Sequence, residues 1–198
     1  LSKGHGCPTL YVTLAHFGFF PKEELRSLRK IGSFLQGHPQ LGLPGLEAST
    51  GSLGQGLSIA NGMALSAKLD KKKDVRAYCL LGDGEINEGQ VWEAAMTAAH
   101  YKLDNLCAMI DYNNLQIDGF LCDVKDMDCL KSKWESFGWH VFEIDGHDFA
   151  QIADSLDEAQ KIKEKPAMIL AHTIKGKGVS FIENKVNWHG IAPTPGEL

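Results

Sequence analysis

The stretch Tyr78–Gly84, which reads YCLLGDG, decides the fold, because an apolar run ends abruptly in two glycines around an acidic residue. A second apolar run, 106–110, ends in Asp111-Tyr112-Asn113-Asn114. Runs that are apolar throughout predict strands whose two faces are both buried, as in a parallel sheet. The polar residues behind both runs then lie at the carboxyl ends of adjacent strands, where open α/β sheets bind their ligands.

The rest of the chain extends this pattern. Strands are expected at 77–81, 106–110, 139–144 and 167–171, with helices at 88–101 and 148–163 between them. Alternation of buried strands with helices predicts an α/β fold with a parallel sheet and helices on both faces. In the first 70 residues, helical patterns cover 9–20, 23–35 and 53–69, and a loop rich in Gly and Pro covers 37–51. Three glycines inside the last of these helices indicate close packing or the approach of a ligand.

Composition narrows the class of protein. The 198 residues carry a net charge of -5, which argues against nucleic acid as a partner. No apolar run approaches the length of a membrane span, so no membrane association is expected. The five cysteines are odd in number and form no C-x-x-C pair, which argues against a zinc site or a disulfide framework and favours the reducing cytoplasm. No linker or repeat divides the chain, so we expect a single domain over 1–198.

Asp83 and Asn113 are the best candidates for metal ligands. Both follow predicted adjacent strands and both offer hard oxygen atoms, which Mg²⁺ prefers. Mg²⁺ needs few protein ligands when a phosphate supplies the others. Gly84 lets the backbone approach a diphosphate, and a helix beginning behind it favours an anion. These residues together predict a site for Mg²⁺ and a diphosphate.

With these motifs in view, the sequence resembles the thiamine diphosphate enzymes and, more narrowly, the diphosphate-binding domain of the transketolase family. The resemblance covers nearly the whole chain, with the motifs in the order that the family has. They are Leu1–Gly6 (LSKGHG), His38-Pro39, Ser49–Gly56 (STGSLGQG), Gly82–Glu85 (GDGE) with Glu88-Gly89, Asp111–Asn114 (DYNN), Asp145–His147 (DGH), Lys175–Gly178 (KGKG) and Trp188–Gly190 (WHG).

The resemblance implies a role for each matching position. Mg²⁺ (or Ca²⁺ or Mn²⁺, which can substitute) would bind the side chains of Asp83 and Asn113 and the backbone carbonyl of Leu115. The other implied contacts to thiamine diphosphate come from His5, Gly51, Leu53, Gly84, Ile117 and His189. His5, His38 and His189 would be catalytic, because imidazoles titrate near neutral pH and can move protons on substrate hydroxyls.

Three further residues have two interpretations each. Lys175 lies in a glycine-spaced loop and is either a contact of the diphosphate or a solvated lysine. Glu88 and Glu93 flank the start of a helix, where carboxylates are favoured in any case. The family instead suggests a chain of carboxylates that links two active sites across a dimer.

The function that the resemblance implies is a transketolase of carbohydrate metabolism, as in the pentose phosphate pathway. A two-carbon ketol unit would pass from a ketose phosphate to an aldose phosphate. Deoxyxylulose-phosphate synthase and 2-oxo acid dehydrogenase components share GDG and NN, but the WHG ending and Trp92-Glu93 fit transketolase better. A non-catalytic binding module with this fold is the alternative of another class.

Two parts of the family's enzyme have no counterpart in these 198 residues. One is the pyrimidine-binding domain, whose glutamate protonates the cofactor, and the other is an amino-terminal stretch. The chain is therefore expected to be a split-gene subunit or a fragment that works with a pyrimidine-binding carboxy-terminal subunit in a heterotetramer. We expect self-association across a two-fold axis through the small residues Ala94, Ala95, Ala98 and Ala99.

Overall fold

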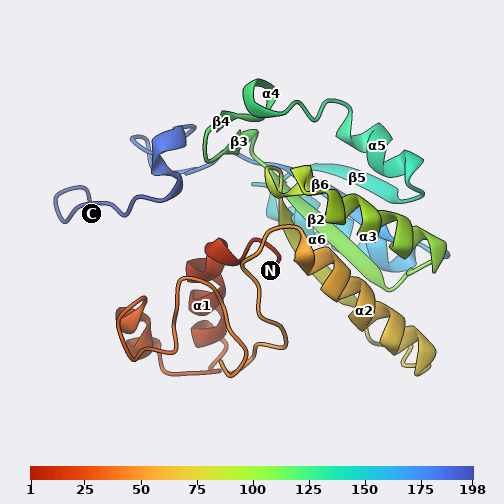
Figure 1. Cartoon of the computed structure of the whole chain (residues 1–198), viewed down its shortest axis with the longest axis horizontal. Helices are drawn as coiled ribbons and strands as arrows, with labels where there is room; N and C mark the ends of the chain where they lie inside the picture. The colour runs from red at the N-terminus through yellow and green to blue at the C-terminus, as the bar shows by residue number, and fades with distance from the viewer.

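Four parallel strands form the central sheet in the computed structural model, which describes residues 1–198. They are β1 (Ala77–Gly82), β2 (Leu106–Tyr112), β5 (His140–Asp145) and β6 (Ala167–His172), in the order β1-β2-β6-β5. Each strand lies within two residues of its predicted range. All four predicted strands are thus confirmed, and their carboxyl ends meet at one edge of the sheet (Figure 1).

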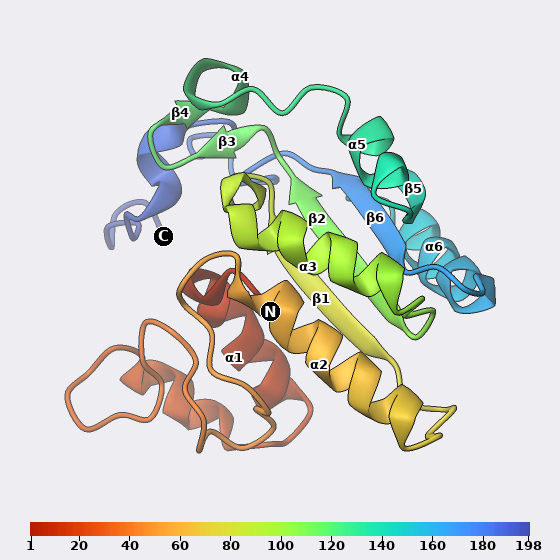
Figure 2. The ribbon, with the colours of Figure 1, turned by 45° about the vertical axis from the view of Figure 1, so that its right-hand side comes forward.

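Helices cover both faces of this sheet, as predicted. On one face lie α2 (Gln55–Leu69), α3 (Gly89–His100) and α5 (Leu130–Ser136), and on the other lies α6 (Phe149–Lys161) (Figure 2). Successive residues of β2 point to opposite faces: Ala108 joins the core under α2 and α3, whereas Cys107 joins the core under α6. No helix of the chain combines the length and the apolar character that crossing a membrane requires.

The first 54 residues form a lobe with a core of its own beside α2, and Ser2 and Lys3 join this lobe to the sheet (Figures 1 and 2). It contains a short 3-10 helix, η1 (Gly4–Gly6), then α1 (Cys7–His16) and a second 3-10 helix, η2 (Lys22–Ser27). Its small core includes Cys7, Tyr11 and Leu35.

The helix predicted over 23–35 is wrong, because only η2 forms there. The backbone turns at Arg29 and Gly32, whose φ angles are 59° and 83°, outside the helical range. Serine hydroxyls hold this turn: Ser27 donates to the Glu24 carbonyl, and Ser33 accepts from the Leu35 N–H. Tyr11 of α1 then anchors the following segment by donating to the Gln36 carbonyl at 2.8 Å.

Several short elements near the carboxyl edge of the sheet were not predicted. η3 (Glu85–Asn87) follows β1 directly, and a hairpin of β3 (Leu115–Gln116) and β4 (Gly119–Phe120) follows β2. After the hairpin comes α4 (Leu121–Val124), and η4 (Val186–His189) lies near the end of the chain. These elements are too short to show a hydrophobic period, so the pattern of residues cannot reveal them.

The alanines of α3 do not form a surface for a second chain. Ala94, Ala95 and Ala98 are at most 4% exposed and pack within their own core. The helix that the small side chains admit is α2 of the same chain, whose Asn61 donates to the Ala94 carbonyl at 2.8 Å. Ala99, which is half-buried, also packs against this core, so the expectation that these alanines carry self-association is corrected.

Candidate functional site

A cavity of about 1150 Å³ opens at the carboxyl ends of the sheet strands. Residues that are far apart in the sequence line it, from η1, the loop before α2, the ends of β1, β2 and β6, and η4. Nearly every predicted site residue lies on its wall: His5, Gly51, Leu53, Asp83, Gly84, Asn113, Leu115, Ile117, Lys175 and His189. The fold thus brings together residues that the sequence separates by up to 184 positions (189 minus 5).

Asp83 is a buried carboxylate of this cavity, only 2% exposed. Its two oxygens accept hydrogen bonds from the backbone N–H groups of Gly84 at 2.8 Å and Asn114 at 2.6 Å. None of the ion pairs of the chain includes it. Burial raises the pKa of Asp83 to about 6, although backbone N–H donors oppose this rise. An ionised carboxylate here therefore lacks a cationic partner of its own.

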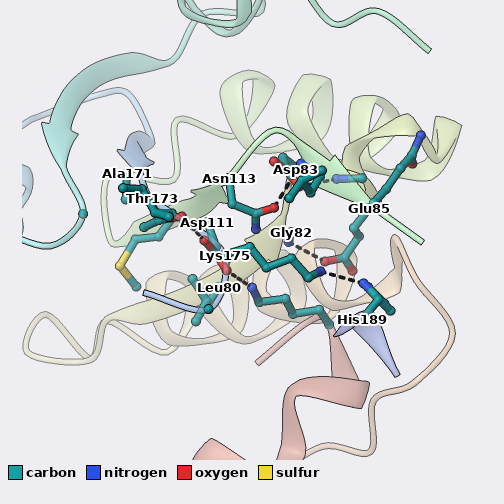
Figure 3. A pocket seen from close by; sticks show the side chains of 18 of the residues that line it. Leu80, Gly82, Asp83, Glu85, Asp111, Asn113, Ala171, Thr173, Lys175 and His189 are labelled. Carbon is teal, nitrogen blue, oxygen red and sulfur yellow. Dashed lines mark hydrogen bonds and ion pairs between the residues drawn. The ribbon is translucent and has the colours of Figure 1, made fainter. Parts of the chain in front are cut away.

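Asn113 faces Asp83 from the end of the neighbouring strand (Figure 3). Its side-chain oxygen accepts from the Leu115 N–H at 3.0 Å, which closes a tight turn at the start of the β3–β4 hairpin. This turn places Leu115 at the cavity, with the residue 2% exposed. The three predicted metal-binding residues consequently lie on one wall.

The oxygen atoms of Asp83 and Asn113 fit a Mg²⁺ ion that also binds a diphosphate. They are too few to hold a metal ion by themselves. The chain contains no group of three or more His, Cys, Asp or Glu side chains that could hold an ion. One buried carboxylate beside one amide oxygen leaves several positions of an octahedron for phosphate oxygens and water. Next to Asp83, the backbone of Gly84 lies close to Gln116: a Cβ on Gly84 would be 2.9 Å from the Cβ of Gln116, so a larger residue would displace this part of the wall.

A second carboxylate, Asp111, is already neutralised. Lys3 forms an ion pair with one of its oxygens, and the Thr173 hydroxyl donates to the other at 2.5 Å. Burial by itself would raise the pKa of Asp111, but Lys3, Thr173 and Asn113 outweigh it and lower the pKa. Neither Lys3 nor Asp111 nor Thr173 was predicted to have a role, although Lys3 and Asp111 lie within the quoted motifs. Only their common position at one edge of the sheet reveals the pair.

His5 and His189 lie next to each other on the wall of the cavity. Their ring centroids are 5.3 Å apart, and the Lys175 ammonium lies 2.7 Å from Nδ1 of His189 (Figure 3). Burial, followed by the charge of Lys3, lowers the pKa of His5. Burial and then Lys175 lower the pKa of His189, and burial likewise lowers that of Lys175. Both imidazoles are thus held in the neutral form at neutral pH.

His38 does not line the cavity, unlike the other two predicted catalytic histidines. Its exposed ring lies against Gly51, where a Cβ would be 3.1 Å from Cδ2 of the ring. Because Gly51 does line the cavity, His38 stands just behind its wall. The structure therefore brings His38 next to the site without exposing it to the cavity itself.

His147 supports the loop that carries Lys175. Its Nε2 accepts a hydrogen bond from the Ile174 N–H at 2.7 Å, so its proton is on Nδ1. No pattern in the sequence indicated that His147 would form this hydrogen bond. Glu88 and Glu93, by contrast, have exposed side chains on this chain and lie outside the cavity.

Two apolar side chains stand at the mouth of the cavity. Leu53 is 39% exposed and Ile117 is 66% exposed, although both line the cavity wall.

Comparisons with known proteins agree on one family. The family model for the thiamine diphosphate binding domain of transketolase matches residues 1–197. The chain is 45% identical over 194 residues to an apulose-4-phosphate transketolase subunit of Phocaeicola vulgatus, covering 98% of this chain and 69% of that subunit. It is 47% identical over 195 residues to a 6-deoxy-6-sulfo-D-fructose transketolase subunit of a Clostridium species, covering 98% and 70%.

Solved structures give the same result. The transketolase of Campylobacter jejuni superposes with a TM-score of 0.86 at 33% identity, over 93% of this chain and 30% of that one. The chain thus spans about 70% of the two subunits but under a third of this solved transketolase.

Proposed function

This chain belongs to the transketolase family as its thiamine diphosphate binding domain, and on that premise we propose that it supplies the diphosphate- and Mg²⁺-binding half of a ketol-transfer site. The reaction would move a two-carbon ketol unit from a ketose phosphate to an aldose phosphate. The observation that carries the proposal is the buried Asp83, which has no cationic partner and lies beside Asn113 on the wall of the cavity.

Different residues of this chain would bind the metal ion, the diphosphate and the rest of the cofactor. Asp83, Asn113 and the carbonyl of Leu115 would hold Mg²⁺, and Gly84 would lie against the diphosphate. Lys175 would balance the remaining negative charge of the diphosphate. Gly51, Leu53 and Ile117 would contact the cofactor through backbone and aliphatic surface. When bound, thiamine diphosphate supplies the carbon nucleophile and the electron sink for cleaving a carbon–carbon bond.

The histidines would handle protons on substrate oxygens. The Lys175 ammonium donates to Nδ1 of His189, so the single proton of this neutral imidazole is on Nε2, from which it can be given to an oxygen. Beside it, the neutral His5 can accept a proton at the same time. His38, behind Gly51, would hold the hydroxyl on the first carbon of the donor sugar once the loop adjusts around a substrate.

The assembly forms a separate part of the proposal. Relatives that this chain matches over about 70% of their own length carry names of transketolase subunits, which supports a partner subunit for this chain. We propose that the partner binds the pyrimidine end of the cofactor and supplies the missing glutamate, in a heterotetramer with two copies of each chain. Five free cysteines, three of them buried, support a reducing compartment such as the cytoplasm.

The decisive experiment is a calorimetric titration of thiamine diphosphate into the chain assembled with its partner, with and without Mg²⁺. We expect binding to require Mg²⁺ and Asp83→Ala to weaken it at least about tenfold, equivalent to about 1.4 kcal/mol. Asp154→Ala, which removes an exposed carboxylate on α6, is the control and should bind normally. Unchanged affinity in Asp83→Ala would remove the metal assignment.

A further inference from the structure

Glu85 is a buried carboxylate that contacts no cation and does not belong to the proposed metal site. It is 3% exposed, and its oxygens accept three hydrogen bonds from three different segments. Oε1 accepts from the Ser2 hydroxyl at 2.5 Å and from the Gly54 N–H at 2.9 Å. Oε2 accepts from the Gly82 N–H at 3.0 Å (Figure 3). A buried carboxylate is costly unless it is satisfied in this way.

Each of these three segments carries part of the site. Ser2 lies three residues before His5, and Gly54 directly follows the loop of Gly51 and Leu53. Gly82 immediately precedes Asp83 at the end of β1. One side chain therefore joins the backbone around a proposed catalytic histidine, the proposed cofactor loop and the proposed metal ligand.

The packing around Glu85 leaves little room for these segments to move independently. The Ser2 N–H donates to the Leu80 carbonyl at 2.8 Å, which adds the amino-terminal segment to the edge of β1. A Cβ on Gly56 would lie 2.3 Å from Oγ of Ser2, and one on Gly4 would lie 2.6 Å from the backbone of Thr50. Since backbone meets backbone here, a shift of one segment must displace the next.

We propose that Glu85 is a positioning residue that sets the spacing between His5, the Gly51–Leu53 loop and Asp83. Its two oxygens are taken up by the three donors, so it acts through these segments and not on the reacting atoms. The three hydrogen bonds to Glu85, here called the clamp, are a property of this chain alone. Their consequence for catalysis rests on the proposed function. The two can therefore be tested apart.

Glu85→Gln is the informative substitution because it nearly preserves volume. A carboxylate offers acceptor sites on both oxygens, whereas a carboxamide has one oxygen and an NH₂ group that can only donate. Three donors converge on this side chain, so in the variant at least one of the Gly54 and Gly82 N–H groups faces the NH₂ group or loses its bond. Leaving such a buried donor unpaired loosens the segment that carries it.

The first measurement uses the isolated chain without ligands. Amide hydrogen exchange of Gly54 and Gly82, followed by NMR, should be at least about tenfold faster in Glu85→Gln than in the wild type. Asn61→Ala is the matched control, because it also removes a buried hydrogen bond, between α2 and α3, away from the cavity. Unchanged exchange at both glycines, or the same acceleration in the control, overturns the clamp.

Ser2→Ala provides a milder variant if Glu85→Gln does not fold. It removes only the tie to the amino-terminal segment and keeps the carboxylate. Exchange of the Gly6 amide, which is bonded to the Lys3 carbonyl at 2.9 Å, should accelerate while that of Gly82 stays unchanged. Ser58→Ala, which removes a hydroxyl from the side of α2 that faces Gln90, should leave both amides unaffected. If neither amide exchanges faster in Ser2→Ala, the proposed role of the Ser2–Glu85 hydrogen bond is overturned.

The second measurement uses the chain assembled with its partner. Glu85→Gln should weaken binding of thiamine diphosphate at least about tenfold and lower kcat, while Asn61→Ala at a similar melting temperature keeps both. Glu85→Asp, which keeps two acceptor oxygens, should recover part of the loss. If exchange accelerates but affinity and kcat match those of Asn61→Ala, Glu85 serves the fold alone and the positioning role is overturned. Failure of the wild type to bind the cofactor would overturn the proposed function, with the exchange result still deciding the clamp.

Discussion

Two carboxylates at the same edge of the sheet, Asp83 and Asp111, have pKa values that are shifted in opposite directions. Lys3 neutralises Asp111 and the pKa of that group is lowered, whereas burial raises the pKa of Asp83 to about 6 in the absence of any such partner. The difference is in the neighbours and not in the residue type, since both follow apolar strands. Only Asp83 therefore remains available for a cation.

The charge of Lys175 gives a prediction about His189. A positive charge 2.7 Å from the ring disfavours the imidazolium, so Lys175→Met should raise the pKa of His189 towards 6.5. Burial, which is the larger cause, remains and keeps the pKa below that value. Titration of the histidine resonances by NMR measures this, with Lys177→Met, an exposed lysine of the same loop, as the control. A fall in the pKa in Lys175→Met would contradict the electrostatic assignment.

The same shift has a consequence for stability. Because the pKa of His189 is lower in the folded chain than in the unfolded chain, its contribution to stability is complete above pH 6.5 and is lost as the pH falls. In Lys175→Met this loss should become smaller, since the folded and unfolded values come closer. Urea denaturation of both forms at a series of pH values would reveal it, and an equal loss in both forms would argue against the linkage.

The histidines also give a prediction about turnover. His38→Ala and His189→Ala should each lower kcat of the assembled enzyme about a hundredfold if these side chains move or stabilise a proton. Neither ring is fully buried, so the melting temperature should change little. Steady-state kinetics and thermal unfolding of the same preparations decide the matter. Normal turnover with a lowered melting temperature would mean that the histidines are structural.

At the scale of elements, glycine occurs at three positions in and next to α2, and its surroundings differ at each one. Gly54 caps the helix with a φ angle of 85°, which other residues rarely adopt. Gly56 makes room for Ser2, and Gly62 faces open space with no atom within 4 Å of a Cβ. The expectation of close packing therefore holds for Gly56 and for Gly54, whose Cβ would lie 2.7 Å from the Cβ of Glu88, but not for Gly62.

These two helical glycines make a matched pair of tests. Gly56→Ala should lower the free energy of unfolding by about 1–3 kcal/mol, because the methyl group overlaps Ser2. Gly62→Ala should raise it by about 1 kcal/mol, because alanine has the higher helix propensity and meets no obstacle. Urea denaturation of the isolated chain measures both. Equal effects of the same sign would show that the contact with Ser2 has no energetic weight.

At the scale of the whole molecule, the proposed function assigns to this chain only the half of the ketol-transfer site that binds the diphosphate and Mg²⁺. We predict that the isolated chain has no such activity with a ketose phosphate and an aldose phosphate. Activity should appear when a pyrimidine-binding partner is added, because under the proposed function that partner would bring the glutamate for the cofactor. Light scattering should then give a complex of two copies of each chain. Robust turnover by the purified chain alone would contradict this division of the site.

The residue pattern by itself determined the strands and the position of Asp83, Gly84 and Asn113 behind them, whereas most other predicted cavity residues came from the resemblance to a family. Strands buried on both faces must be apolar throughout, and residues behind them must meet at one edge, so local sequence suffices for both. Only the tertiary structure decided the turn at Arg29, the Lys3–Asp111 pair and the clamp at Glu85. Lys3 and Asp111 are 108 positions apart, and Ser2 and Glu85 are 83 apart. Contacts at such separations leave no periodic trace along the chain, because they depend on how finished elements pack and not on any one element.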